Sequence, residues 1–266
     1  MTALWLNGQT RSGKTAWLID QLGPFADTQA DTLAQGASLL VFAANGDNRI
    51  RLAERIATAT QARYPVVTTT PAGFMQDEIT LFWPLLVQSL GLTAQFPLKL
   101  RPENEQELAA RLWQPQIEQG LLLVQGWQPA QTVRRALDFL QLAASDGIPA
   151  EDLPTLLKQG IPPGFAPVEV WEAMGQAILD WRDWCLAQGV VTYGIMTELY
   201  WRYLLPHPLY QEKLQQRYCA LLGDDVDEYP GVSRQWFELF LDQERPCAFT
   251  WNDYGRVRLG VGADPD

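Results

Sequence analysis

Near its N-terminus the chain reads Gly8-Gln9-Thr10-Arg11-Ser12-Gly13-Lys14-Thr15. An apolar segment, residues 3–6, precedes this octapeptide, and residues 16–19 continue it with a helical pattern. The two glycines allow the backbone to curl, so that successive N–H groups point inward at phosphate oxygens. The order strand, glycine-rich turn and helix therefore predicts a P-loop that binds a nucleoside triphosphate with magnesium.

Each position of the P-loop has an expected role. The backbone of residues 8–13 should surround the phosphates, and the helix that begins at Lys14 should add its positive N-terminal dipole. We expect the Lys14 ammonium to reach the β- and γ-phosphates and to act in catalysis. The Thr15 hydroxyl should hold Mg²⁺.

A second candidate group follows an apolar run near the end of the chain. Asp224, Asp225, Asp227 and Glu228 come directly after residues 218–223, and four carboxylates so close together repel one another unless a cation is near. Asp224, at the end of a neighbouring buried strand, is the metal candidate. Asp225, or Glu228 in its place, would orient and activate the attacking water. The alternative is a solvated acidic turn that caps a helix over residues 232–241.

Strand and helix patterns alternate in the first part of the chain. Further strands are predicted at 38–43 and 65–70, and helices at about 49–58 and 75–86. This alternation indicates an α/β fold with a parallel sheet that is covered on both faces.

From about residue 103 to 216 the apolar residues recur at helical spacing, with prolines and glycines between the segments. We expect a mostly helical insertion, after which the sheet returns at 218–223 and ends in a hairpin over 247–261. The predicted organisation is a sheet domain over 1–95 and 211–266, interrupted by a helical subdomain over 96–210.

Composition limits the function classes. The formal net charge of −11 argues against a free-standing, nonspecific nucleic-acid binder. Three widely spaced cysteines indicate reduced, buried thiols, and the single histidine excludes a His-rich metal centre. Because neither a signal peptide nor a membrane-spanning run is recognisable, we expect a cytoplasmic protein without a membrane partner.

Four segments, in order, resemble a superfamily 1 DNA helicase of the UvrD/Rep and AddB kind. Residues 6–15 are similar to the family's Walker A motif, G-x-A/R-G-S-G-K-T. Residues 39–56 resemble I-L-x-L-T-F-T-N…M-x-E-R-I, and residues 66–74 lie where the family has V-x-T-x-H-x-F. Residues 217–239 match, without gaps, R-F-x-x-I-L-V-D-E-x-Q-D and its following helix.

The resemblance implies a RecA-like P-loop NTPase domain with an inserted helical subdomain, and ATP with Mg²⁺ as cofactors. It further implies that the full-length protein couples ATP hydrolysis to movement on single-stranded DNA, with a second motor domain and a partner nuclease or helicase subunit. The family's strand-binding positions correspond to Ala44, Asn45, Gly46, Thr69 and Thr70. Residues 259–266 resemble the start of the next motif, V-G-D-x-x-Q, so we expect an N-terminal region of a longer protein, inactive in isolation.

Departures from the pattern leave two alternatives open. The family's catalytic Glu aligns with Asp225, which is one methylene shorter, and its sensing Gln aligns with Asp227, or with Pro230 in a shifted register. A catalytically degenerate scaffold for a partner nuclease or motor is one alternative. The other is a small-molecule kinase. Its candidate substrate contacts are Arg134, Arg135 and Arg202, which would otherwise lie on solvated helix faces.

Overall fold

The computed structural model describes residues 3–160, 166–253, 255 and 262–264. The chain divides into two compact units, a sheet unit of Met1–Met75 with Leu205–Asp266 and a helical unit of Gln76–Leu204. The sequence analysis placed these boundaries later, at 95/96 and 210/211. Helix α6 (Trp83–Leu90) belongs to the helical unit, since Trp83 is buried there and its indole N–H donates to the Ala94 carbonyl at 2.9 Å.

In the described part of the sheet unit there are five strands, all parallel, in the order β1-β7-β6-β2-β3. They are β1 (Leu4–Asn7), β2 (Ser38–Phe42), β3 (Val66–Thr69), β6 (Tyr218–Gly223) and β7 (Cys247–Trp251). Every residue of β6 is buried, as expected for a parallel strand covered on both faces. The α/β class and the parallel sheet predicted from the sequence are confirmed.

Strand β7 differs from the prediction in its partners. It pairs in parallel with both β1 and β6, so that Ala248 lies opposite Leu4 on one side and Leu222 on the other. It therefore lies between the P-loop strand β1 and β6, the strand predicted to neighbour the P-loop. The second arm of the predicted hairpin, residues 256–261, lies outside the described residues.

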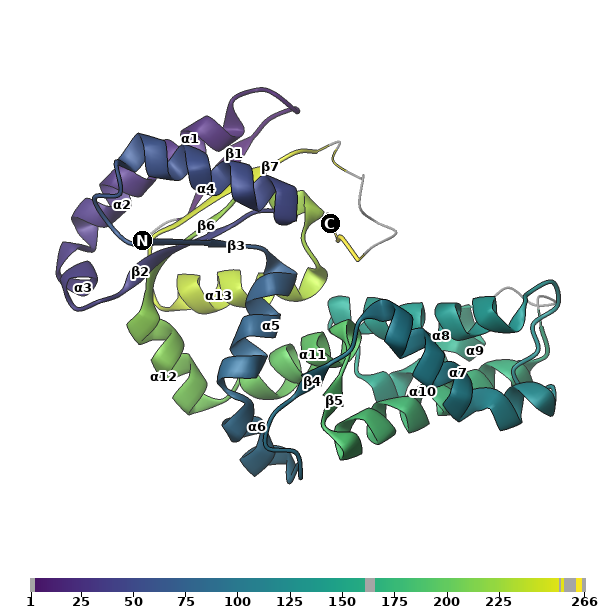
Figure 1. Ribbon diagram of the computed structural model, residues 1–266. Coiled ribbons are helices and arrows are strands. Elements are labelled where there is room, and N and C mark those ends of the chain that lie inside the picture. Colours follow the sequence, from purple (N-terminus) through teal and green to yellow (C-terminus); the bar gives the residue numbers. More distant parts are fainter. Residues whose placement is uncertain (1–2, 161–165, 254, 256–261, 265–266) are drawn as a thin grey trace. The chain divides into compact units, whose positions relative to one another are not determined.

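Helices cover both faces of this sheet. Figure 1 shows α1 (Lys14–Asp20) and α4 (Gly46–Thr60) on one side and α13 (Arg234–Asp242) on the other. The first face is an aliphatic core, whereas on the second Trp236 stacks on Phe42 with 5.0 Å between ring centroids. The remaining helical segments of the unit are α2 (Leu22–Thr28), α3 (Ala30–Ala34), α12 (Pro208–Arg217), the 3₁₀ turns η3 (Val226–Glu228) and η4 (Gly231–Ser233), and the first part of α5 (Pro71–Leu81).

The helical unit is built around buried tryptophans. Trp113 and Trp181 pack edge to face, with ring centroids 6.3 Å apart, and the Trp113 indole N–H donates to the Ala177 carbonyl. Core packing thus accounts for these rings. Besides α6, the unit contains β4 (Leu98–Lys99), α7 (Pro102–Glu118), α8 (Pro129–Ser145), η1 (Ala150–Asp152), α9 (Leu153–Gly160), α10 (Val168–Gln188), β5 (Val190–Val191), α11 (Tyr193–Leu199) and the π-helical turn η2 (Tyr200–Leu204).

A buried ion-pair network links α10, α11 and η2. Glu198 is 1% exposed and accepts hydrogen bonds from Arg182 Nε at 2.6 Å and from Arg202 Nη1 at 2.9 Å. Arg202 also donates to Glu151 at 2.6 Å. Burial alone would lower the pKa of Arg182, but the hydrogen bond and charge of Glu198 outweigh it and raise that pKa. Arg202, a candidate substrate contact in the kinase reading, is part of this network.

The structure bears on the state of the cysteines and on membrane-spanning helices. The cysteines Cys185, Cys219 and Cys247 are free and buried, as predicted. Burial raises the pKa of Cys247 to about 12, which keeps that thiol protonated. Within the described ranges, no helix combines the length and apolar character needed to cross a lipid bilayer.

Glu105 on α7 makes the stability of the helical unit depend on pH. Burial raises its pKa to about 7 and outweighs the hydrogen bond from Thr192 and the charge of Arg134, while Asp138 raises it further. Because the unfolded value is about 4.3, the folded chain binds an extra proton between these two pH values. The free energy of unfolding should therefore fall as pH rises from about 5 to 7 and level off above it.

Glu105→Gln should flatten this dependence and stabilise the chain at pH 8, measured by urea unfolding at several pH values. Glu107→Gln, at an exposed position on the same helix, is the matched control and should leave the dependence unchanged. An unaltered pH profile in Glu105→Gln would contradict the assignment.

Candidate functional site

The predicted P-loop, residues 8–15, consists of a tight turn between β1 and α1, residues 8–13, and the first two residues of α1. Gly13 precedes α1 with φ 92°, and Arg11 adopts φ 67°. A Cβ at position 8 would lie 2.5 Å from the Ser12 hydroxyl oxygen, so a side chain there would require Ser12 to move. The remaining loop residues, Gln9 to Ser12, are exposed. The backbone thus has the curled form that a phosphate cradle requires.

The P-loop is attached to the end of β7. The Gly8 N–H donates to the Trp251 carbonyl at 3.0 Å. Beside this bond, Asp253 accepts from the Asn7 amide at 2.5 Å and from the Trp251 indole N–H at 2.9 Å. Movement of the end of β7 would therefore displace the P-loop.

Asp224 connects the P-loop with the acidic turn, residues 224–228. Its Oδ2 accepts from the Thr15 hydroxyl at 2.9 Å and its Oδ1 from the Thr250 hydroxyl at 2.8 Å. The Tyr229 hydroxyl donates to the backbone carbonyl of Asp224 at 2.9 Å. The two predicted metal ligands, Thr15 and Asp224, are thus in direct contact.

Burial makes Asp224 a favourable position for a cation. The residue is 8% exposed. Burial, and secondly the negative charge of Asp225, raise the pKa of Asp224, and the hydroxyl hydrogen bonds and Lys14 offset this only in part. A positive ion beside this carboxylate would reverse that balance.

Lys14 makes three contacts within the site. Its ammonium is 2.7 Å from the Gly8 carbonyl and 3.2 Å from the Gln9 carbonyl, and it forms an ion pair with Asp225 at 3.3 Å. Asp225 adopts φ 54°, and its N–H donates to Thr250 Oγ1 at 2.7 Å. Asp225, predicted to activate water, is here the counter-ion of the P-loop lysine.

The rest of the acidic turn also differs from a simple helix cap. Glu228 ends η3, and its N–H donates to the Asp225 carbonyl at 3.0 Å. Helix α13 begins only at Arg234, after η4, and its N-cap residue Ser233 makes no side-chain capping bond. The alternative reading, in which the acidic residues cap this helix, is therefore wrong.

Thr250 and Tyr229 are site residues that the sequence analysis missed. Thr250 is fully buried and its hydroxyl bridges Asp224 and Asp225. A signal for Thr250 was present, because a polar residue near the carboxyl end of a buried apolar strand lies close to the edge where the carboxyl ends of parallel strands meet. Thr250 was not recognised because residues 247–261 were assigned to a hairpin and not to a strand inside the parallel sheet.

The predicted DNA-binding residues lie at or just after the carboxyl ends of β2 and β3. Asn45 is the N-cap of α4, where its side chain accepts from the Asn48 N–H at 2.9 Å, with Ala44 and Gly46 on either side. Thr70 accepts from the Gly73 N–H at 3.1 Å, and the Thr69 hydroxyl donates to the Thr70 carbonyl at 3.4 Å. These polar side chains thus already hold local structure.

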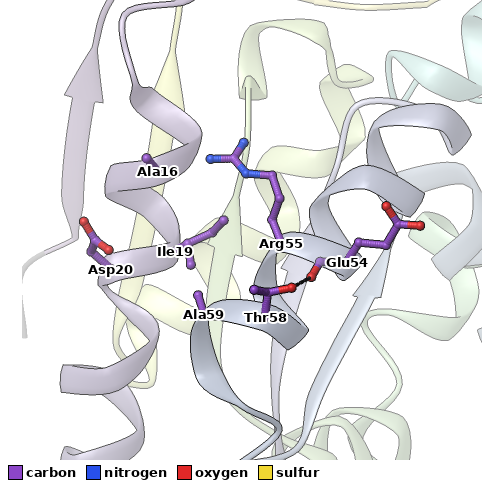
Figure 2. Close-up of a pocket in the computed structure, with 7 residues that line it drawn as sticks. All are labelled: Ala16, Ile19, Asp20, Glu54, Arg55, Thr58 and Ala59. Atoms are coloured by element: carbon purple, nitrogen blue, oxygen red, sulfur yellow. Dashed lines mark hydrogen bonds between the residues drawn. The ribbon is translucent and has the colours of Figure 1, made fainter.

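A separate cavity of about 380 Å³ lies between α1 and α4. Figure 2 shows Arg55 extending from α4 into the space between the two helices, and Thr58 donating to the Glu54 carbonyl at 2.9 Å. No residue of the P-loop or the acidic turn is among those that line it, which are Ala16, Ile19, Asp20, Glu54, Arg55, Thr58 and Ala59. The cavity is therefore distinct from the candidate site.

Comparison with known proteins gives no family assignment. No protein-family model matches the chain, and no curated protein matches it significantly.

Proposed function

We propose that this chain binds ATP with Mg²⁺ through the P-loop and the acidic turn. The observation that carries the proposal is the 2.9 Å contact between Thr15 and Asp224, which are 209 residues apart in the sequence. A hydroxyl at the start of a P-loop helix and a carboxylate after a buried strand are the protein groups expected around a nucleotide-bound magnesium ion.

The residues present fit this cofactor. The N–H groups of Gly8 and Ser12 donate to the carbonyls of Trp251 and Gln9, so the other N–H groups of the loop, at residues 9–11 and 13, are the candidate donors for phosphate oxygens. Lys14 would exchange its contacts with Asp225 and two carbonyls for the phosphates. Thr15 and Asp224 would hold the magnesium ion, which neutralises phosphate charge when bound. Magnesium needs few protein ligands, and in the described part of the chain no group of three or more His, Cys, Asp or Glu side chains is placed to hold a metal.

The wider proposal is that the chain is the ATP-binding, RecA-like region of a cytoplasmic, superfamily 1-like DNA helicase or helicase-related recombination protein. Two observations support it. The four resembling segments occur in the family's order, and the P-loop, the acidic turn and residues 44–46 and 69–70 all lie at or directly after carboxyl ends of strands in one parallel sheet. The full-length protein would couple ATP hydrolysis to movement on single-stranded DNA.

A catalytically degenerate scaffold is the second candidate. The shorter side chain of Asp225 favours it, because this carboxylate forms an ion pair with Lys14 in the structure and has one methylene fewer than the family's catalytic Glu with which to reach an attacking water. DNA-stimulated ATPase activity of the full-length protein supports the motor, and DNA binding without ATPase activity supports the scaffold.

Asp224→Asn tests the magnesium site. The wild-type chain should bind ATP about tenfold more tightly with excess magnesium than in EDTA, measured by isothermal titration calorimetry, and the variant should lose this difference. The same substitution should raise Tm by about 2–4 °C, because it removes a buried carboxylate of raised pKa and retains an acceptor. A wild-type chain that binds no ATP, or binds it equally well without magnesium, overturns the proposal.

A further inference from the structure

Asp227 is the most deeply buried carboxylate of the acidic turn and has no role in the site described above. It is 1% exposed. One oxygen, Oδ1, accepts a hydrogen bond from the Asn252 N–H at 2.9 Å. This bond joins the acidic turn to the segment that follows β7.

The other oxygen of Asp227, Oδ2, lies where a side chain at position 255 would be, and residue 255 is a glycine. A Cβ at position 255 would lie 1.8 Å from Asp227 Oδ2, and the Gly255 N–H donates to the Asn252 carbonyl at 2.9 Å. The carboxylate therefore occupies the space that a side chain at position 255 would need. Burial raises the pKa of Asp227, so the fold retains this group against a desolvation penalty.

Three consecutive residues at the end of β7 anchor the two halves of the site. Thr250 binds Asp224 and Asp225, Trp251 accepts from the N–H of Gly8, and Asn252 donates to Asp227. The contact with Asp227 is the last of the three and lies beyond the strand's pairing with β6, which ends at the Gly223–Phe249 pair. It is thus placed to keep residues 250–252 against the acidic turn.

We propose that Asp227 is a positioning residue for the magnesium site. By holding Asn252, it fixes the end of β7, and through Thr250 and Trp251 it sets the separation between Asp224 and the P-loop. This role rests on the proposed binding of magnesium and ATP. In the ungapped register, Asp227 is the residue that aligns with the sensing glutamine of the resembling family.

Three variants test the role from both sides of the contact. Asp227→Ala removes the acceptor, and Gly255→Ala introduces a Cβ into the space of the carboxylate. Asp227→Asn retains an oxygen that can accept from Asn252 and is the conservative control. The first two should weaken ATP affinity in excess magnesium about tenfold and leave affinity in EDTA within about twofold of wild type, whereas Asp227→Asn should behave as wild type.

Amide hydrogen exchange, resolved by NMR without nucleotide, gives an independent readout. The N–H groups of Asp225 and Gly8, which donate to Thr250 and Trp251, should exchange at least about tenfold faster in Asp227→Ala and Gly255→Ala than in wild type or Asp227→Asn. Unchanged exchange at both amides overturns the proposal, as does a failure of both altered variants to fold, which would make the contact a requirement of the fold. Wild-type ATP binding that is insensitive to magnesium overturns the proposed function instead, and the amide rates still decide the role of Asp227.

Discussion

Replacing Lys14 by alanine is expected to lower the affinity of the chain for ATP about 100-fold. The estimate follows from the loss of charge-assisted hydrogen bonds to phosphate, together worth about 3 kcal/mol. The chain should still fold, because Asp225, the ion-pair partner that the substitution leaves behind, is 32% exposed and water can solvate it. Isothermal titration calorimetry with ATP and magnesium measures the effect.

Lys213→Ala is the matched control for Lys14→Ala. It removes the same charge from the same unit at an exposed position on α12, and its ATP affinity should stay within about twofold of wild type. If both variants bind ATP equally well, the P-loop lysine does not contact the phosphates.

Replacing Glu198 by alanine is expected to lower the free energy of unfolding by about 3–5 kcal/mol. The large effect arises because Arg182, 9% exposed in its side chain, would keep its charge while its closest carboxylate disappears. Arg202 would lose one of its two acceptors as well. Urea unfolding measures the free energy, and hydrogen exchange of peptides from α10 and α11 should place the loss in the helical unit.

Glu107→Ala provides the comparison for Glu198→Ala. It breaks the ion pair between Glu107 and Arg111, whose side chains are 61% and 70% exposed, respectively. Such surface pairs contribute about 0.2–1 kcal/mol. An equal loss of unfolding free energy in the two variants would show that the burial of Glu198 does not determine its contribution to stability.

The sequence was sufficient for the parts of the site that depend on local pattern. Gly8, Lys14 and Thr15 belong to one continuous motif, and an apolar run identified β6 and therefore Asp224 as the first polar residue after it. Their contact across the sheet also follows from the rule that carboxyl ends of parallel strands share one edge. The parallel sheet itself follows from alternating strand and helix patterns.

The missed features depend on strand order and burial, which a single sequence does not encode locally. Thr250 reaches Asp224 only because β7 enters the sheet between β1 and β6. Likewise, Glu198 and Arg202 have the i,i+4 spacing of an exposed pair, yet Glu198 is buried. Asn45 and Thr70 matched DNA-binding positions, and the structure engages both side chains in local backbone hydrogen bonds.

The position of β7 also has a consequence for biosynthesis. β1, which carries the P-loop, spans residues 4–7 and pairs with residues 248–251, so the ribosome must add about 240 residues before the two strands can meet. At about 5–20 residues per second this takes roughly 12–50 s. The helical unit, continuous over Gln76–Leu204, emerges complete within that interval. We therefore expect the helical unit to fold first, before β6 and β7 are synthesised and can pair with β1 and β2.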